Sequence, residues 1–193
     1  MDDKKDTMTA EEWVSDGEIF TRKNGQGIFY RRDGSGPSLV LLHGYPTWSY
    51  DDADVTPDLA RDFDVIAVDF LGYGSSDKPR DHAFSVSESA DTVEELLAHL
   101  GVQDAALVIH DYGGIVGQEI LDRRRRDALT FNLTGVHILN CGIVYAAYRP
   151  IRKQKLLLMP VLGRFFASML TKERMFPVLN TLHGDKKTHA KPI

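Results

Sequence analysis

The chain has almost no cysteine and no long apolar run. Cys141 is the single cysteine among 193 residues, so no internal disulfide can form and a reducing compartment is expected. No uninterrupted apolar stretch approaches the length that crosses a bilayer, and the first residues, MDDKKDTMTAEE, are charged rather than apolar. These absences predict a cytoplasmic protein with neither a secretion signal nor a membrane segment.

An excess of positive charge is also missing. Lys and Arg number 23 against 28 Asp and Glu, which leaves a formal net charge of −5 and disfavours binding to nucleic acid or to an anionic membrane surface. The basic run Arg123–Arg126 is interpreted as the end of a helix, where cations complement the helix dipole. Neither a metal-ligand spacing nor a nucleotide-binding glycine loop is found, so no metal and no cofactor are expected.

What the chain does contain is a series of short apolar runs separated by helical patterns. Two-sided apolar runs, the pattern of strands covered on both faces, occur at 38–42, 64–70, 105–110 and 133–139. Apolar spacing predicts helices over 85–100, with Ser85 or Ser87 as the cap, and over 115–121. Alternating strands and helices predict an α/β protein with a mostly parallel, doubly wound sheet.

The segment before the first buried run has a different texture. Short strands at 19–20 and 28–31 flank Asn24-Gly25, which predicts a hairpin, and residues 33–37 are expected to form a surface loop. Residues 1–12 are expected to be a disordered lead-in.

The most informative stretch is VIHDYGG at 108–114, an apolar strand that runs into Asp111 and a glycine pair. It has the form of a nucleophile elbow, the sharp strand-to-helix turn that usually presents a serine, with a carboxylate in the reactive position. A carboxylate there points to attack on carbon with formation of an ester. The alternative is that Asp111 merely caps a helix that starts near Gly113.

A second glycine-bearing turn follows another buried strand. His43, Gly44 and Tyr45 come directly after the run at 38–42. Ligands bind outside the carboxyl ends of parallel strands, so this turn and the Asp111 turn are expected to meet there. The backbone N–H groups of Tyr45 and Tyr112 are then predicted to face one oxygen, as an oxyanion hole.

Taken together, these motifs resemble the α/β-hydrolase superfamily, in the branch of haloalkane dehalogenases and epoxide hydrolases. The resemblance rests on LLHGYPTWSY at 41–50, DVIAVDFLGYGSSDKP at 64–79, VIHDYGG at 108–114 and LTGVHILN at 133–140. Within the branch, these tracts look most like the mesoderm-specific transcript protein group. The resemblance implies an α/β-hydrolase fold acting on a small-molecule substrate. It also implies a partial hydrolase core at 13–147 and, at 148–193, the start of a helical cap with a polar tail, the cap helices lying at 149–158 and 162–170.

The resemblance also implies roles for individual residues. Asp111 matches the nucleophile, and Tyr45 and Tyr112 match the residues whose N–H groups form the oxyanion hole. His43, Gly44 and Gly113 match structural positions at the site, His43 being a hydrogen-bonded loop histidine rather than a general base.

The chain departs from the dehalogenases at two positions. Those enzymes usually carry Asn after His-Gly and Trp after the nucleophile, where this chain has Tyr45 and Tyr112. Epoxide hydrolases tend to have an aromatic residue after His-Gly, which fits Tyr45 better. Tyr145 and Tyr148 lie at the entrance of the expected cap, but neither matches the cap tyrosines that protonate an epoxide.

Neither the acid nor the histidine of a complete triad is found in the sequence. In the family both follow the nucleophile, whereas here Asn140 follows the last strand and the late histidines, His183 and His189, sit in an unpatterned tail. His110 and His137 are expected to pack. The chain therefore reads as C-terminally truncated and impaired in turnover, with self-association expected through the exposed edge at 133–139. An active haloalkane dehalogenase and a non-catalytic remnant that needs a complementing partner are the alternatives.

Overall fold

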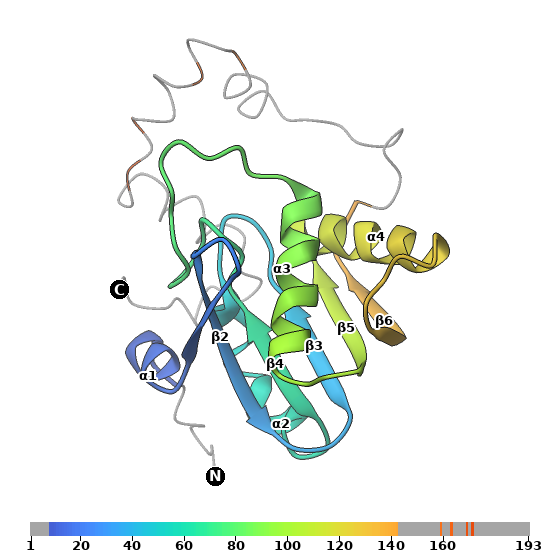
Figure 1. The fold of residues 1–193 in the computed structure, drawn as a ribbon. Helices are drawn as coiled ribbons and strands as arrows, with labels where there is room; N and C mark the ends of the chain where they lie inside the picture. The colour runs from blue at the N-terminus through green and yellow to red at the C-terminus, as the bar shows by residue number, and fades with distance from the viewer. Residues whose placement is uncertain (1–7, 143–158, 160–162, 164–168, 170, 172–193) are drawn as a thin grey trace. The chain divides into compact units, whose positions relative to one another are not determined.

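The computed structural model describes residues 8–142 and the single positions 159, 163, 169 and 171 (Figure 1). The helices are α1 Ala10–Ser15, the 3₁₀ helix η1 Ser49–Asp52, α2 Thr56–Leu59, α3 Val86–His99 and α4 Tyr112–Arg125. The strands are β1 Glu18–Thr21, β2 Gly27–Gly34, β3 Ser38–Leu42, β4 Asp64–Val68, β5 Asp104–His110 and β6 Asn132–Leu139.

The strands form one sheet in the order β1-β2-β4-β3-β5-β6. β1 and β2 form the predicted hairpin, and β2 also pairs antiparallel with β4. β4, β3, β5 and β6 are parallel to one another, so their carboxyl ends lie along a single edge. The prediction of a mostly parallel α/β sheet is confirmed.

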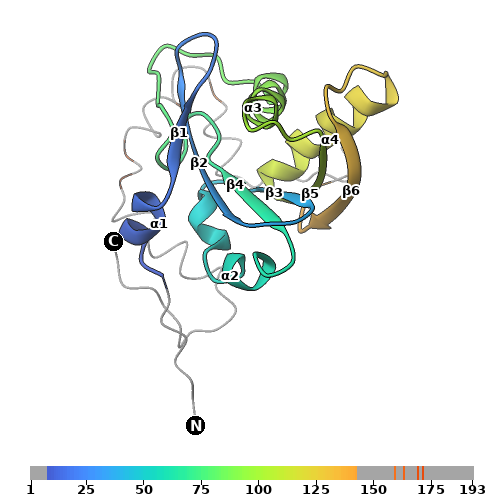
Figure 2. The same ribbon diagram turned by 60° about the horizontal axis from the view of Figure 1, so that its bottom comes forward.

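Helices cover both faces of the sheet, as Figure 2 shows, with α3 and α4 on one side and α2 on the other. Alternation along β3 explains the two layers. Val40 and Leu42 pack with α3 and α4 in one buried cluster, whereas Leu39 and Leu41 pack with Trp13 of α1 in another. A strand that is apolar at every position is therefore the one that has helices on both sides.

The first helix corrects the predicted lead-in over 1–12. α1 begins at Ala10 because Thr9 and Glu12 form a reciprocal capping box. Long-range contacts then hold the helix: the Trp13 indole N–H donates to Ser49 Oγ at 3.0 Å, and the Arg31 guanidinium lies 4.7 Å from the Trp13 ring centroid. Residues 1–7 lie outside the described residues.

Other boundaries also differ from the predictions. β2 continues to Gly34, into the expected loop at 33–37, because residues 30–34 pair with β4. β4 ends at Val68 rather than 70, and α4 begins at Tyr112 rather than 115. The short helices η1 and α2 were not predicted, since runs of four residues carry too little periodicity. The α3 cap is Ser85, whose side chain accepts the Glu88 N–H.

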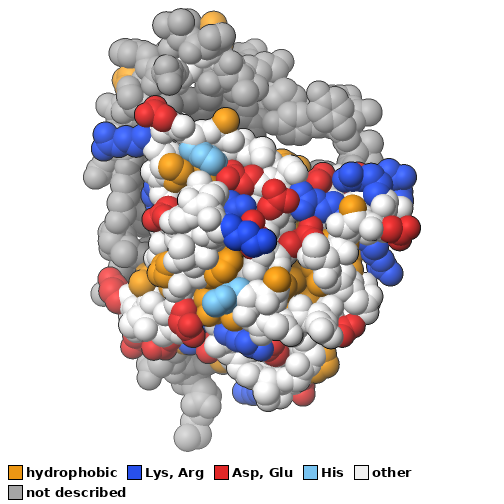
Figure 3. Space-filling view, viewed as in Figure 1, with side chains coloured by type: hydrophobic (Ala, Val, Ile, Leu, Met, Phe, Trp, Pro, Cys, Tyr) orange, Lys and Arg blue, Asp and Glu red, His pale blue; other side chains and the backbone are white. Residues whose placement is uncertain are grey.

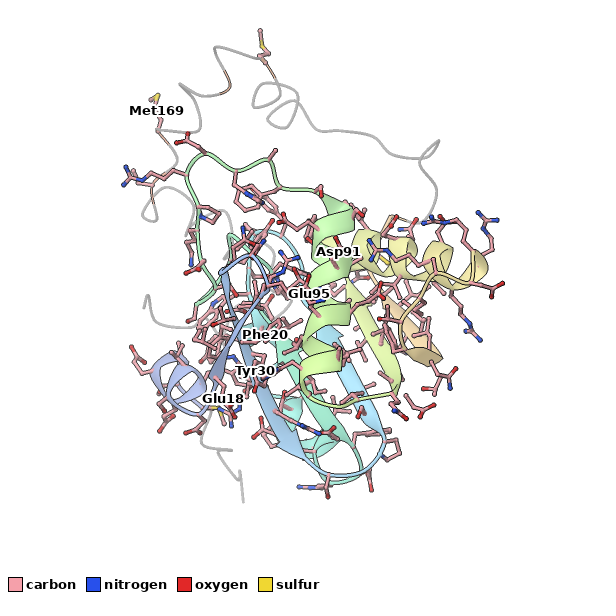
Figure 4. The ribbon with its side chains drawn as sticks, viewed as in Figure 1. Glu18, Phe20, Tyr30, Asp91, Glu95 and Met169 are labelled. Atoms are coloured by element: carbon pink, nitrogen blue, oxygen red, sulfur yellow. The ribbon has the colours of Figure 1, made fainter. Side chains whose placement is uncertain are left out.

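An ion-pair network joins the two helices on the α3/α4 face. Arg123 Nη1 donates to Asp91 at 2.6 Å and to Glu94 at 2.7 Å, and its Nε donates to Glu119 at 3.0 Å. Figure 4 labels Asp91 on α3, and Figure 3 shows acidic and basic side chains interspersed over this face. Three of the four arginines at the end of α4 are thus paired with carboxylates, since Arg125 and Arg126 both pair with Asp122.

β6 is the last strand of the described sheet, and Ile138 and Leu139 on it are exposed. Self-association through this edge stays a prediction. The chain divides into two compact units, residues 1–145 and 146–193, and the cap helices predicted at 149–158 and 162–170 fall almost wholly outside the described residues. Within the described part, no helix is long and apolar enough to cross a membrane.

Candidate active site

Asp111 occupies the junction between β5 and α4 in an unusual backbone conformation. Its φ is 46° and its ψ is −106°, outside the regions that non-glycine residues commonly adopt. An ordinary helix N-cap is extended and accepts from the second or third helical N–H. The Asp111 side chain accepts instead from Tyr112, the first helical residue, at 2.7 Å. The local geometry is that of a strained turn which presents a side chain, not of a simple cap.

The second turn reaches the same oxygen. The Tyr45 N–H, from the loop after β3, donates to Asp111 Oδ1 at 2.8 Å, so Oδ1 accepts two backbone N–H groups. Among residues 8–142, Oδ2 has no hydrogen-bond partner, and the Asp111 side chain is exposed. The structure thus brings Tyr45, Asp111 and Tyr112 together in the arrangement expected from the sequence.

Two glycines allow this close approach. A Cβ on Gly44 would lie 2.8 Å from Asp111 Cβ and 3.1 Å from His110 Nδ1. A Cβ on Gly113 would overlap the carbonyl oxygen of Leu42 and lie 2.7 Å from its carbonyl carbon. The first turn of α4 therefore packs directly on the end of β3, where the Gly113 N–H donates to the His43 carbonyl at 2.9 Å.

His43 has both ring nitrogens engaged in hydrogen bonds. Nε2 accepts the Phe70 N–H at 3.1 Å, which requires the proton on Nδ1, and Nδ1 donates to the Gly44 carbonyl at 2.9 Å. Burial lowers the pKa of His43 and keeps the ring neutral. With no free nitrogen, His43 ties the loop after β3 to the loop after β4.

Asp69, which was not predicted from the sequence to be a residue of the site, links the same two loops. Its carboxylate is fully buried; Oδ1 accepts the Ser49 N–H at 2.8 Å and Oδ2 accepts the Ser75 N–H at 2.7 Å. Gly74, with φ of 44°, packs against this carboxylate so tightly that no Cβ would fit. The glycines of DFLGYGSS could have indicated this role for Asp69. They favour a tight turn after the strand, and such a turn brings the chain back onto the end of the strand.

An aromatic wall stands beside the Asp111 turn. The Tyr73 ring stacks on Tyr112 with centroids 5.9 Å apart and meets Tyr45 edge-on at 6.5 Å. The Tyr112 hydroxyl forms a hydrogen bond with Ser89 Oγ of α3, 3.0 Å away. Burial raises the pKa of Tyr73 to about 12, together with the neighbouring phenols and the charge of Asp111. Tyr73 was not predicted from the sequence to lie at the site.

The remaining histidines lie in varied settings. His82 pairs with Glu88 at 2.7 Å, His99 packs on Phe20, and His110 is partly buried. His137 was expected to pack but is exposed, because no described element covers its end of the edge strand β6. His183 and His189 lie outside the described residues. In the described part, no group of three or more metal-ligating side chains is found.

A cavity of about 460 Å³ lies away from this site, between β1 and α3. Phe20 and His99 line it, together with Glu94 and Glu95. Both carboxylates already accept hydrogen bonds from arginine, Glu94 from Arg123 and Glu95 from Arg22. The two carboxylates of the cavity wall are thus engaged in ion pairs within the fold. The turn at Asp111 is the better candidate for an active site.

Asp52, in η1 just beyond the Tyr45 turn, is expected to make the free energy of unfolding depend on pH. Burial, with the charge of Asp51, raises the pKa of Asp52 from 3.8 to about 7. A raised folded-state pKa means that the stabilisation is complete below pH 3.8 and is lost as the pH rises through about 7. Asp52→Asn is therefore expected to raise the unfolding free energy at pH 8 by about 1–2 kcal/mol, with the smallest change near pH 4.

Chemical denaturation of both proteins at pH 4 and pH 8 measures this difference. The matched control is Asp54→Asn, at a neighbouring exposed aspartate, which should shift stability little at either pH. An equal effect of Asp52→Asn at the two pH values would argue against titration of this carboxyl.

The fold and the comparisons with known proteins define the class of the protein. The family model for the alpha/beta hydrolase fold matches residues 37–132, the stretch that holds the strands β3, β4 and β5 and the helices α3 and α4. The chain belongs to the α/β-hydrolase superfamily.

Individual proteins are similar to the chain over most of its length. The chain is 42% identical over 179 residues to the mesoderm-specific transcript homolog protein of Homo sapiens, a match that covers 86% of this chain and 53% of that protein. Among solved structures, the epoxide hydrolase CorEH without ligand superposes with a TM-score of 0.69 at 30% identity, covering 86% of this chain and 60% of that one. The haloalkane dehalogenase DatA from Agrobacterium tumefaciens C58 gives 0.67 at 25%, covering 84% and 55%. The chain spans about half the length of the curated relatives it matches.

Proposed function

We propose that the chain is a hydrolase in which Asp111 attacks a carbon atom and displaces an oxygen or a halide, forming an aspartyl ester. The observation that supports this most directly is the unequal setting of the two carboxylate oxygens. Oδ1 is held by the N–H groups of Tyr45 and Tyr112, whereas Oδ2 has no partner among residues 8–142. A carboxylate fixed through one oxygen presents the other as a nucleophile in a defined direction.

The same two N–H groups suit the second step. Once Oδ2 is esterified, Oδ1 is the carbonyl oxygen of the ester. Water that adds to the carboxyl carbon places negative charge on Oδ1, between donors already at 2.7 and 2.8 Å. Cleavage of the bond between the carboxyl carbon and Oδ2 then releases the alcohol and restores Asp111. Tyr45 and Tyr112 are proposed as the oxyanion donors in this step.

Residues 8–142 are proposed to supply no base for that second step. Within residues 8–142, no histidine has a hydrogen bond to Asp111, and His43 has no free nitrogen. Without a base to activate water, the ester is expected to form and then to break down slowly. We therefore propose a hydrolase that forms the aspartyl ester faster than it hydrolyses that ester.

Intact-protein mass spectrometry tests the proposal. The purified 193-residue chain is mixed with styrene oxide or with 1-bromo-2-phenylethane, and the mass is followed with time. We expect one covalent adduct per chain, which maps to Asp111 and outlasts the initial reaction. Release of bromide in repeated turnovers would favour the dehalogenase alternative, and the absence of any adduct with either compound would favour a non-catalytic remnant.

A further inference from the structure

The cavity between β1 and α3 has the size of a small-molecule site. Its volume of about 460 Å³ falls within the range of about 300–1,000 Å³ that is usual for such sites. β1 forms one wall with Phe20, and the last two turns of α3 form the other, with Glu95 and His99. Figure 4 labels Phe20 and Glu95, one on each wall. No step of the proposed reaction at Asp111 uses this cavity.

An aromatic pair forms the apolar part of the lining. The rings of Phe20 and His99 pack with their centroids 4.9 Å apart. Phe20 belongs to the main buried cluster, whereas His99 is exposed. Ala98, next to His99, is also exposed, and its single methyl group leaves room beside the two rings. The lining therefore offers a surface on which a flat aromatic body can pack.

Negative charge outnumbers positive charge around the cavity. Arg22 and Arg123 each form ion pairs with more than one carboxylate. The carboxylates are Glu88 and Glu95, which pair with Arg22, and Asp91, Glu94 and Glu119, which pair with Arg123. Five carboxylates thus share two guanidinium groups, which leaves an excess of negative charge along α3.

The end of α3 adds to this negative field. The helix has 14 residues and ends at His99, so the negative end of its dipole borders the cavity. Cations are stabilised at such a position. The lining also contains Lys23, in the turn after β1, whose side chain is exposed and has no ion pair with residues 8–142. An exposed lysine in a turn can move its ammonium group into solvent when another cation binds.

We propose that this cavity binds a small organic cation with an aromatic body, an arylalkyl ammonium ion. The aromatic body packs against Phe20 and Ala98, and the ammonium group lies between the Glu95 carboxylate and the end of α3. The Glu95 carboxylate accepts from Arg22 at 3.0 and 3.3 Å, and its side chain is 26% exposed. Each carboxylate oxygen has a second lone pair, so Glu95 can accept from a further donor.

Three naphthalene probes test the proposal, one with an aminomethyl group, one with a hydroxymethyl group and one with a carboxylate. Each is titrated into the full ¹⁵N-labelled chain, and the amide NMR shifts of Thr21 and Ala98 report binding at the cavity. We expect the amine to saturate these shifts at about millimolar concentration, as a ligand of this size typically does. It should bind about threefold more tightly than the alcohol, and the carboxylate should bind most weakly. Added salt should weaken binding of the amine but not of the alcohol.

Lys23→Gln gives the sharpest readout, because it removes a like charge from the lining. The amine should bind about threefold more tightly to this variant, whereas the alcohol should bind as it does to wild type. Arg61→Gln is the matched control. It removes the same charge just after α2, which lies on the other face of the sheet from α3 (Figure 2), and should change neither affinity.

Ala98→Trp tests the location of the site. It fills the cavity from an exposed helical position, so neither the amine nor the alcohol should still shift the amide of Thr21. Thermal unfolding within about a degree of wild type confirms that each variant is folded.

Several results would overturn the proposal. Equal affinities for the three probes, or tightest binding of the carboxylate, would contradict the assignment to cations. Weaker binding of the amine to Lys23→Gln would contradict it as well. If no probe gave saturable shifts at Thr21 and Ala98, the cavity would not be a binding site for this class of molecule.

Discussion

Asp111→Asn is expected to abolish the covalent adduct, lowering its rate of formation by about 10⁴-fold or more, the scale seen when a nucleophile is removed. An amide oxygen carries no charge and is a poor nucleophile. The fold should survive, because the asparagine oxygen can still accept the N–H groups of Tyr45 and Tyr112. Asn also tolerates the positive φ of 46° at this position. The measurement is intact mass after incubation with the bromoalkane, alongside a thermal unfolding curve.

The chain offers a matched control for this substitution. Asp127 has a similarly positive φ of 53°, is exposed, and lies in the turn after α4. Asp127→Asn makes the same chemical change at a comparable backbone conformation and should leave adduct formation untouched. An adduct that persists in Asp111→Asn would show that another side chain is the nucleophile.

The predicted strands were correct where burial alone decides the structure. β3 is buried along most of its length, and β5 alternates between buried and partly buried positions, so their apolar runs stand out in the sequence and the ends of the strands nearly match the prediction. The hairpin was predicted from its turn residues, and Gly25 does have a positive φ of 86°. The start of the chain was read wrongly because its charged residues hide a helix. α1 depends on Trp13 meeting Ser49 and Arg31, contacts that no local pattern reveals.

The residues of the site also fall into two groups, those that the sequence pattern predicts and those that it does not. Tyr45 and Tyr112 could be placed beside Asp111 because the carboxyl ends of neighbouring parallel strands must share an edge. Asp69 and Tyr73 could not, because their positions depend on how the loop after β4 turns. That loop turns through Gly72 and Gly74, whose φ values are 92° and 44°, and these turns set Tyr73 beside Tyr112. Strand order is predictable from pattern, whereas loop conformation is decided by contacts with the finished fold.

The second large effect concerns stability. Gly113→Ala is expected to lower the unfolding free energy by about 3 kcal/mol or more, because the added Cβ meets backbone atoms of Leu42, including the carbonyl carbon at 2.7 Å. Alanine normally stabilises a helix by about 1 kcal/mol relative to glycine, so the sign itself is diagnostic. Relief of the clash also moves the first turn of α4, and with it the Tyr112 N–H on Asp111. Adduct formation should therefore slow together with the loss of stability.

Two other glycines calibrate the result. At Gly117 the atoms nearest to an added Cβ belong to the Ile109 side chain, with Cδ1 at 2.7 Å and Cγ2 at 2.8 Å, and not to backbone. Gly117→Ala should therefore destabilise the fold, but less than Gly113→Ala. At Gly135 in β6 the nearest atom is Ala106 Cβ at 3.9 Å, an ordinary contact, so Gly135→Ala should be neutral or stabilising by up to about 1 kcal/mol. Thermal unfolding of the three variants gives the order. If Gly113→Ala melted as high as Gly135→Ala, α4 would not pack on the end of β3 as closely as the Asp111 turn requires.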